Sequence, residues 1–158
     1  MIEVKNLTKR YGNHLAVDHL NFTVESGKIY GFLGPNGAGK STTMNIMTGY
    51  LGATEGQVLI DGHDILKEPE EAKKNIGYLP EIPPLYMEFA AELKGIKKDK
   101  RESQIEEVIR LAKLRDVENR LIQNLSKGYK QRVGLAQAVL GFPEIIILDE
   151  RTVGLDPK

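Results

Sequence analysis

Residues 34–41 read GPNGAGKS and match the pattern G-x-x-x-x-G-K-[ST], which constrains the fold more than any other part of this sequence. An apolar run, KIYGFL at 28–33, precedes the match, and residues 40–48 are typical of a helix that ends at Gly49. Glycines let the backbone curl until successive N–H groups point at phosphate oxygens, and a helix N-terminus adds partial positive charge. Because both flanks are right, we predict a phosphate-binding loop between a buried strand and a helix, rather than a glycine-rich turn that matches by chance.

Two side chains of this loop have expected roles of their own. Lys40 is expected to reach the β- and γ-phosphates of a nucleotide, and the Ser41 hydroxyl to take a position on Mg²⁺. A nucleotide with Mg²⁺ is therefore the expected ligand of this loop, and the family resemblance described below implies that the nucleotide is ATP. The residues expected to contact the nucleotide here are Gly34, Pro35, Asn36, Gly37, Ala38, Gly39, Lys40, Ser41 and Thr42.

Two carboxylates follow a second apolar run, IIIL at 145–148. This run predicts a buried strand that ends at Asp149 and Glu150. Asp149 can hold Mg²⁺ there, directly or through water, and Glu150 can act as the catalytic base that polarises the attacking water. A strand that ends in Asp-Glu is common for structural reasons alone, but its combination with the phosphate loop favours the catalytic interpretation.

The composition is that of a globular domain in a reducing cytoplasm. The chain has 158 residues, 41% hydrophobic and 28% charged, and a domain of this length buries roughly 70% of its unfolded surface. Its 22 Lys and Arg balance 22 Asp and Glu, which argues against a nucleic-acid binder with a broad basic face. Without cysteine, disulfides and Cys-based zinc sites are excluded. We expect neither a membrane-spanning helix nor a secretion signal.

Periodicity predicts the remaining elements. Strands are expected at 2–6, 20–24, 57–61 and 75–79, and helices at 88–95, at 103–114 and from Ser126 to about residue 140. The basic residues at 97–101 are expected to form a solvated turn rather than a binding patch. His14, His19 and His63 form no ligand cluster and are expected to be structural or to face solvent. The order of strand, loop, helix, helical insertion and buried strand predicts an α/β fold with a parallel core.

Residues 125–132, LSKGYKQR, complete the pattern. Together with the phosphate loop and the acidic strand they resemble the ATP-binding cassette (ABC) ATPases, whose signature begins Leu-Ser-Gly-Gly-Gln. Lys127 replaces the first Gly and Tyr129 the Gln, a variant that is similar to the exporter-type branch. The resemblance implies that Ser126 caps a helix aimed at nucleotide phosphate and that Gly128 permits its close approach.

The same resemblance implies further site residues. Tyr11 occupies the place where the family stacks an aromatic ring on adenine. Glu81 stands where the family usually has a Gln that contacts Mg²⁺ and senses the membrane partner, and a carboxylate oxygen is also a suitable ligand. Residues 154–157, GLDP, resemble the D-loop that bridges two subunits.

Three departures from the family accompany these matches. Only eight residues follow Glu150, whereas the family continues with further core strands and a switch histidine, so we expect a fragment or a chain that lacks segments rather than a naturally shortened domain. Residues 84–89 make a shorter passage into the first insertion helix, at the surface that docks the membrane partner. Arg151 stands where the family has Pro, which removes a restraint on Glu150 and offers it an ion pair.

The resemblance implies a P-loop NTPase (RecA-like) fold: a parallel α/β core with N-terminal antiparallel strands, a helical signature subdomain, and C-terminal core strands missing. We expect one incomplete ABC ATPase domain over 1–158, with a nucleotide-binding part at 1–81, a helical insertion at 82–142, and the acidic strand and D-loop at 143–158. The implied function is ATP hydrolysis that powers a separate membrane-spanning permease, as an exporter, at the cytoplasmic face of the membrane. The implied partners are that permease and a second ATPase subunit in a homodimer or heterodimer, with no nucleic acid. A nucleotide-binding module without turnover and a non-transport ABC ATPase are the alternatives.

Overall fold

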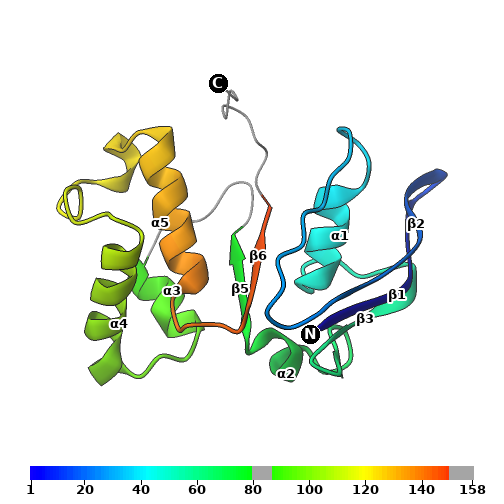
Figure 1. The fold of residues 1–158 in the computed structure, drawn as a ribbon, viewed down its shortest axis with the longest axis horizontal. Helices are drawn as coiled ribbons and strands as arrows, with labels where there is room; N and C mark the ends of the chain where they lie inside the picture. The colour runs from blue at the N-terminus through cyan, green and yellow to red at the C-terminus, as the bar shows by residue number, and fades with distance from the viewer. Residues whose placement is uncertain (80–86, 150–158) are drawn as a thin grey trace. The chain divides into compact units, whose positions relative to one another are not determined.

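The computed structural model describes residues 1–79 and 87–149 of the chain. It divides into two compact units, Met1–Ile76 and Gly77–Lys158, each of which we describe by itself. The first unit consists of a sheet with two helices, and the second combines two strands with a group of helices (Figure 1). The predicted α/β class, with antiparallel strands at the N-terminus, is confirmed.

The first unit is built on an antiparallel sheet with the strand order β2-β1-β3-β4. Strand β1 (Ile2–Tyr11) pairs with β2 (His14–Val24) at one edge and with β3 (Glu55–Ile60) at the other, and β4 (His63–Asp64) pairs with β3. The strands predicted at 2–6, 20–24 and 57–61 all fall within or overlap these strands. The buried apolar side chains of the sheet are Ile2, Val4, Leu7, Val17, Val58 and Ile60.

Two helices accompany this sheet. Helix α1 (Lys40–Met47) follows the glycine-rich loop, buries Thr43, Ile46 and Met47, and ends just before Gly49, whose φ of 66° breaks the helix. It confirms the helix predicted at 40–48. Helix α2 (Pro69–Lys73) was not predicted, although proline in its first turn and two glutamates behind it are ordinary signals of a helix start.

Residues 28–33 do not form the buried strand that their apolar sequence predicts. The structure gives them no strand conformation, and Ile29 and Leu33 expose 102% and 94% of their surface. A buried parallel strand needs hydrogen-bonded neighbours at both edges, and neither sheet within the described ranges includes this segment. Its one aromatic contact joins Phe32 to Phe22 of β2, with ring centroids 5.3 Å apart. The apolar run indicated a tendency to be buried, but it did not specify a partner strand.

The second unit contains a two-stranded parallel sheet and a helical group. Strands β5 (Ile76–Leu79) and β6 (Ile145–Leu148) lie side by side and run in the same direction (Figure 1). They confirm the strands predicted at 75–79 and 145–148, but the predicted burial of the second is only partial, because Ile146 and Leu148 expose 47% and 43% of their surface. The helical elements are α3 (Met87–Leu93), α4 (Lys98–Leu111), the short 3₁₀ turn η1 (Ile122–Asn124) and α5 (Lys127–Val139).

The helices of the second unit share one apolar core. Val108 of α4 is fully buried in it, and Ile105, Ile109 and Ala112 pack around it, as their spacing predicts. The predicted solvated turn at 97–101 is wrong, because α4 begins at Lys98 and takes in most of the basic run. Lysine and arginine are good helix formers, so their charge marked an exposed helical turn rather than a loop. No helix within the described ranges has both the length and the apolar character needed to cross a bilayer.

Candidate functional site

The loop predicted to bind phosphate closes around the side chain of its own lysine. The Lys40 ammonium donates hydrogen bonds to the carbonyl oxygens of Gly34 and Pro35, at 2.6 Å and 2.8 Å. Within the described ranges, the backbone N–H groups of Gly37 and Gly39 find no protein acceptor. A cation and open amide groups around one exposed loop can together bind an anion.

Glycine is required at the end of this loop for two reasons. Gly39 precedes α1 with a φ of 78°, in the left-handed region that side chains rarely adopt. A Cβ atom at this position would lie 2.3 Å from the carbonyl oxygen of Ala16 and 3.1 Å from Cγ2 of Val17. The loop therefore packs directly against the backbone of β2.

The first turn of α1 fixes the loop from the other side. Thr43 is 1% exposed, and its hydroxyl donates to the carbonyl oxygen of Gly39 at 2.9 Å, beside the helical bond from its own amide at 2.8 Å. Ser41 and Thr42 are half-buried in the same turn. The hydroxyl-bearing residues that follow the lysine thus lie on a well-anchored helical turn.

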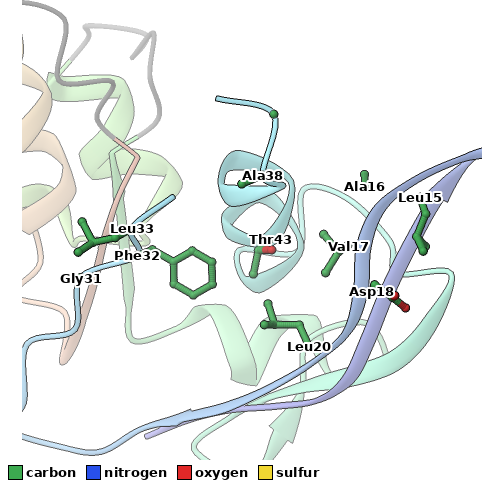
Figure 2. A pocket seen from close by; sticks show the side chains of 11 residues that line it. Leu15, Ala16, Val17, Asp18, Leu20, Gly31, Phe32, Leu33, Ala38 and Thr43 are labelled. Carbon is green, nitrogen blue, oxygen red and sulfur yellow. The ribbon is translucent and has the colours of Figure 1, made fainter. Parts of the chain in front are cut away.

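A hollow of about 740 Å³ adjoins the loop within the first unit. Figure 2 shows its walls, which come from residues 15–18 and 20 of β2, from residues 31–33, and from the loop and α1 at 37, 38 and 43. Most of this lining is apolar side chain or backbone, and Asp18 contributes the one carboxylate. The sequence did not predict this space, because it arises where β2 passes the loop.

Tyr11, the predicted adenine contact, stands at the end of β1 and pairs with His14 of β2. It is 49% exposed, and the Lys9 ammonium lies 5.3 Å from its ring centroid. An exposed aromatic face with an adjacent cation can stack on a planar base. Tyr11 and the loop belong to the same unit.

The predicted signature residues stand at the start of α5 in the second unit. Ser126 is the N-cap, and its hydroxyl oxygen accepts a hydrogen bond from the Tyr129 amide at 3.4 Å. A Cβ atom at Gly128 would meet nothing within 4 Å, so the chain itself places no steric demand on this glycine. The Tyr129 hydroxyl donates to Asp116, which raises the pKa of Tyr129, and Arg132 lies 5.3 Å from the Tyr129 ring.

Asp149 is 8% exposed, directly after β6, and its amide donates to the carbonyl oxygen of Leu79 at 2.9 Å. This bond aligns the predicted metal ligand with the end of β5. The remaining predicted residues Glu81 and Glu150, together with Arg151 and residues 154–157, lie outside the described residues.

Lys94 is an exposed residue with a partly buried ammonium group, and the sequence did not single it out. Its ammonium donates to the carbonyl oxygens of Ala138 and Leu140 at the end of α5, at 2.9 Å and 2.6 Å. Burial lowers the pKa of Lys94 to about 8. One lysine at the end of a helix has no pattern that sequence reasoning can detect.

The histidines of the chain each lie beside a single carboxylate or none in the part that the structure describes. His19 pairs with the adjacent Asp18 at 2.6 Å and His63 with Glu68 at 3.1 Å. The His19 side chain is exposed, and His63 is half-buried. The pKa of Glu68 is lowered chiefly by its hydrogen bond with His63. Among the residues that the structure describes, no three His, Cys, Asp or Glu side chains form a group that can hold a metal ion.

The glycine-rich loop and the helix that follows it are those of a P-loop nucleotide-binding domain, and comparison with known proteins gives the family. A family model described as ABC transporter matches residues 17–153. The chain therefore belongs to the ATP-binding proteins of the ABC transporter family.

Two curated relatives illustrate this membership. YhcH of Bacillus subtilis, an uncharacterized ABC transporter ATP-binding protein, is 43% identical over 166 aligned residues, which cover 99% of this chain and 53% of the relative. The bacitracin transport ATP-binding protein BcrA of Bacillus licheniformis is 41% identical over 165 residues, with the same coverage. The chain thus spans about half the length of these relatives. Both alignments are longer than the chain's 158 residues, so the relatives carry residues that have no counterpart in it.

Solved structures agree with the family assignment. The structure of an ATP-binding subunit of an ABC transporter superimposes with a TM-score of 0.83 at 31% identity and covers 99% of this chain and 68% of that one. A dimeric post-hydrolysis state of the ATP-binding cassette MJ0796, bound to ADP and Pi, matches with a TM-score of 0.81 at 30% identity, covering 99% and 77%.

Proposed function

We propose that this chain binds Mg-ATP and hydrolyses it as the ATP-binding subunit of an ABC transporter. The observation that carries the proposal is the loop at 34–41, which combines the Lys40 ammonium with amides of Gly37 and Gly39 that have no protein acceptor within the described ranges. Nucleotide phosphates suit this site, because they can replace the two carbonyl oxygens as acceptors for Lys40. Tyr11, in the same unit, supplies an exposed ring for the base.

The side chains that we propose as ligands of Mg²⁺ are all oxygen donors. Ser41 offers a hydroxyl from the first turn of α1, Asp149 a carboxylate at the end of β6, and Glu81 a further carboxylate. Oxygen donors of this kind are the ligands that Mg²⁺ prefers, and the bound ion supplies neutralisation of phosphate charge. Asp149 is buried, and a bound Mg²⁺ would bring an opposite charge to its carboxylate.

Glu150 is the proposed general base. It follows Asp149 directly, so the strand that positions the metal ligand also carries the carboxylate that accepts a proton from the attacking water. Arg151 comes next in sequence, and an ion pair with it would favour the ionised form of Glu150 while drawing it away from that water.

Two ATPase subunits are proposed to bind ATP between them. Ser126 and Gly128 are exposed at the start of α5, and the open space around Gly128 leaves room for a phosphate group of a nucleotide held by the other subunit. The dimeric state of the MJ0796 structure supports this arrangement. The second subunit can be a copy of this chain or a related one.

A membrane-spanning permease is the proposed partner, and export the proposed direction. BcrA, whose name describes bacitracin transport, and the lantibiotic transport protein SrtF of Streptococcus pyogenes support this assignment. The chain would then act at the cytoplasmic face of the membrane, with the permease docked near Glu81.

A nucleotide-binding module without turnover is the second candidate, because Arg151 stands beside the proposed base. A non-transport ABC ATPase is a third class, against which the balanced charge argues. Phosphate release in the presence of Mg-ATP distinguishes the hydrolysing transporter subunit from the module without turnover. Turnover that falls at least a hundredfold in Glu150→Gln, with Mg-ATP binding retained, supports the proposal. ATP binding with no phosphate release by the unsubstituted chain would instead assign a module without turnover.

A further inference from the structure

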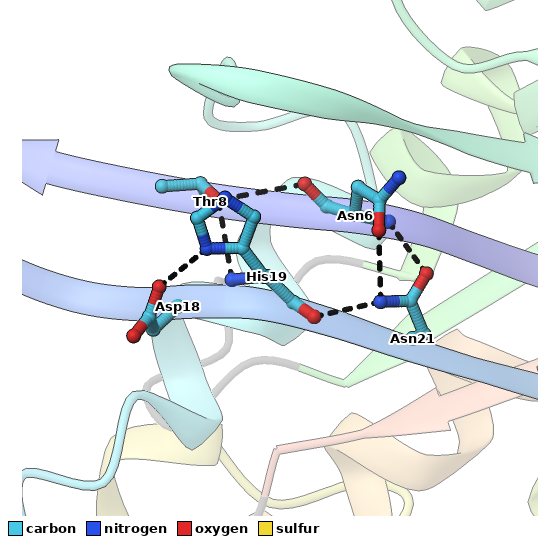
Figure 3. Close-up of polar contacts among 5 residues, drawn as sticks. All are labelled: Asn6, Thr8, Asp18, His19 and Asn21. Carbon is cyan, nitrogen blue, oxygen red and sulfur yellow. Dashed lines mark hydrogen bonds and ion pairs between the residues drawn. The ribbon is translucent and has the colours of Figure 1, made fainter.

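The Asn21 side chain forms hydrogen bonds with Asn6 of β1 and His19 of β2. Its carboxamide oxygen accepts a hydrogen bond from the Asn6 amide at 2.8 Å, and its nitrogen donates to the Asn6 side-chain oxygen at 3.0 Å and to the His19 carbonyl oxygen at 2.7 Å. Figure 3 shows Asn21 of β2 facing Asn6 of β1, with Thr8 beside His19. One exposed side chain thus bonds to both strands.

Thr8 completes this connection from the buried side. It is 1% exposed, and its hydroxyl oxygen accepts a hydrogen bond from the His19 amide at 3.2 Å and donates to the Asn6 carbonyl oxygen at 3.4 Å. We call Asn6, Thr8, His19 and Asn21 the β1–β2 clamp.

Two members of the clamp have an unfavourable backbone conformation. Asn6 has a φ of 49° and His19 a φ of 42°, both in the left-handed region. The β1–β2 register shifts between Val4 and Leu7, which adds a residue to β1, and between Leu7 and Lys9, which adds one to β2. A third shift, between Lys9 and Arg10, adds another residue to β2. A non-glycine residue keeps such a conformation only where its surroundings hold it there.

The irregularity in β2 decides which way Val17 faces. Leu20 pairs with Leu7 and Val17 pairs with Lys9, so β2 spans three residues where β1 spans two. In a regular strand Val17 and Leu20 would point to opposite faces. Here both line the hollow beside the loop, together with Thr43 (Figure 2).

The next contact joins this part of β2 to the phosphate loop. The Ala16 carbonyl oxygen and Cγ2 of Val17 are the atoms that a Cβ at Gly39 would meet, at 2.3 Å and 3.1 Å. A displacement of residues 16 and 17 therefore moves the surface against which Gly39 rests. Gly39 is the last residue before Lys40 and the helix.

We propose that Thr8 and Asn21 are positioning residues for the phosphate loop, acting through the bulge at His19 and through residues 16 and 17. This inference rests on the proposed function, because it assumes that the loop binds nucleotide phosphates. It assigns Thr8 and Asn21 a part in affinity for nucleotide beyond their contribution to sheet stability.

The test measures the Mg-ATP dissociation constant of the full chain by calorimetry, with three substitutions. Thr8→Val removes the hydroxyl at constant shape, Thr8→Ser restores it, and Asn21→Ala removes the exposed half of the clamp. Gly62→Ala is the matched control, because Gly62 has a φ of 87° with nothing within 4 Å, so alanine strains the β3–β4 turn of the same sheet far from β2.

We expect Thr8→Val and Asn21→Ala to weaken Mg-ATP binding by about three- to tenfold, the worth of one or two hydrogen bonds. Thr8→Ser and Gly62→Ala should retain the Mg-ATP dissociation constant of the unsubstituted chain. This should hold even if Gly62→Ala lowers the melting temperature as much as Thr8→Val and Asn21→Ala do. The amide resonance of Gly39 should also shift in Asn21→Ala and stay in place in Gly62→Ala.

Two outcomes overturn the inference in different ways. If the unsubstituted chain binds Mg-ATP and Asn21→Ala binds it equally well, with the Gly39 resonance unmoved, the clamp only stabilises the sheet. If the unsubstituted chain does not bind Mg-ATP, the proposed function fails and this inference fails with it.

Discussion

Substitution of Gly39 by alanine should destabilise the first unit far more than a glycine-to-alanine change normally does. Two effects add at this position. The φ of 78° is left-handed, and holding alanine there costs about 1–2 kcal/mol. The new Cβ would also lie 2.3 Å from the Ala16 carbonyl oxygen, so loop or strand has to move, at a cost of about 1–3 kcal/mol. We therefore expect a loss of about 2–5 kcal/mol in the free energy of unfolding.

Gly37→Ala provides the control for this experiment. Gly37 lies in the same loop with a φ of 85°, but a Cβ there would meet nothing within 4 Å. The free energy of unfolding of Gly37→Ala should therefore fall only by the cost of the backbone strain, about 1–2 kcal/mol. Urea unfolding of both variants, followed by circular dichroism, isolates the contact with Ala16 as the difference between them. Equal losses for the two variants would refute the close packing of the loop against β2.

Two further predictions concern the second unit. Lys94 holds its proton up to its ordinary pKa of 10.5 when unfolded but releases it near pH 8 when folded. The unfolded state therefore binds more protons between these values, and the free energy of unfolding should rise by about 1–2 kcal/mol from pH 8 to 10.5, since solvent screens part of the charge. Lys94→Met should lack this rise in urea unfolding curves, and a rise of the same size in both proteins would contradict the assignment. Gly77→Ala places a Cβ 2.2 Å from the Ala138 carbonyl oxygen and should cost about 1–3 kcal/mol. Unchanged thermal unfolding would mean that β5 does not pack against the end of α5.

Local signals were sufficient to predict several elements of this chain. The glycine-rich motif located α1, and the capping hydroxyl of Ser126 located the start of α5. The helical spacing of Ile105, Val108 and Ile109 identified the buried face of α4. Each of these features depends on residues close together in sequence, so the sequence contains all that is needed to predict it.

The features that were missed depend on distant residues. The run at 28–33 contains four large apolar or aromatic side chains, but a strand forms only where another strand supplies hydrogen bonds, and none within the described ranges does so. Burial lowers the pKa of Lys94, and the carbonyl oxygens that accept its hydrogen bonds lie more than forty residues away in the sequence. The hydrogen bonds of Asn21 with Asn6 likewise depend on strand register, which periodicity did not predict at the bulges.

The site was predicted as a set of residues but not as a geometry. The motif named Lys40, and the structure shows its ammonium held by two carbonyl oxygens. The requirement for glycine at position 39 comes from a carbonyl oxygen of β2, a contact between segments that the motif does not contain. Residues chosen by family resemblance, such as Tyr11 and Ser126, remain predictions about binding.

Calorimetric titration of the folded chain with Mg-ATP tests the central claim most directly. The account predicts saturable binding of one nucleotide per chain, weakened by about ten- to a hundredfold in Lys40→Ala, because each charge-assisted hydrogen bond to phosphate is worth about 1.5–3 kcal/mol. Circular dichroism of the variant confirms that it remains folded. Absence of binding by the unsubstituted chain, or equal affinity in Lys40→Ala, would contradict the claim that the loop at 34–41 binds nucleotide phosphates.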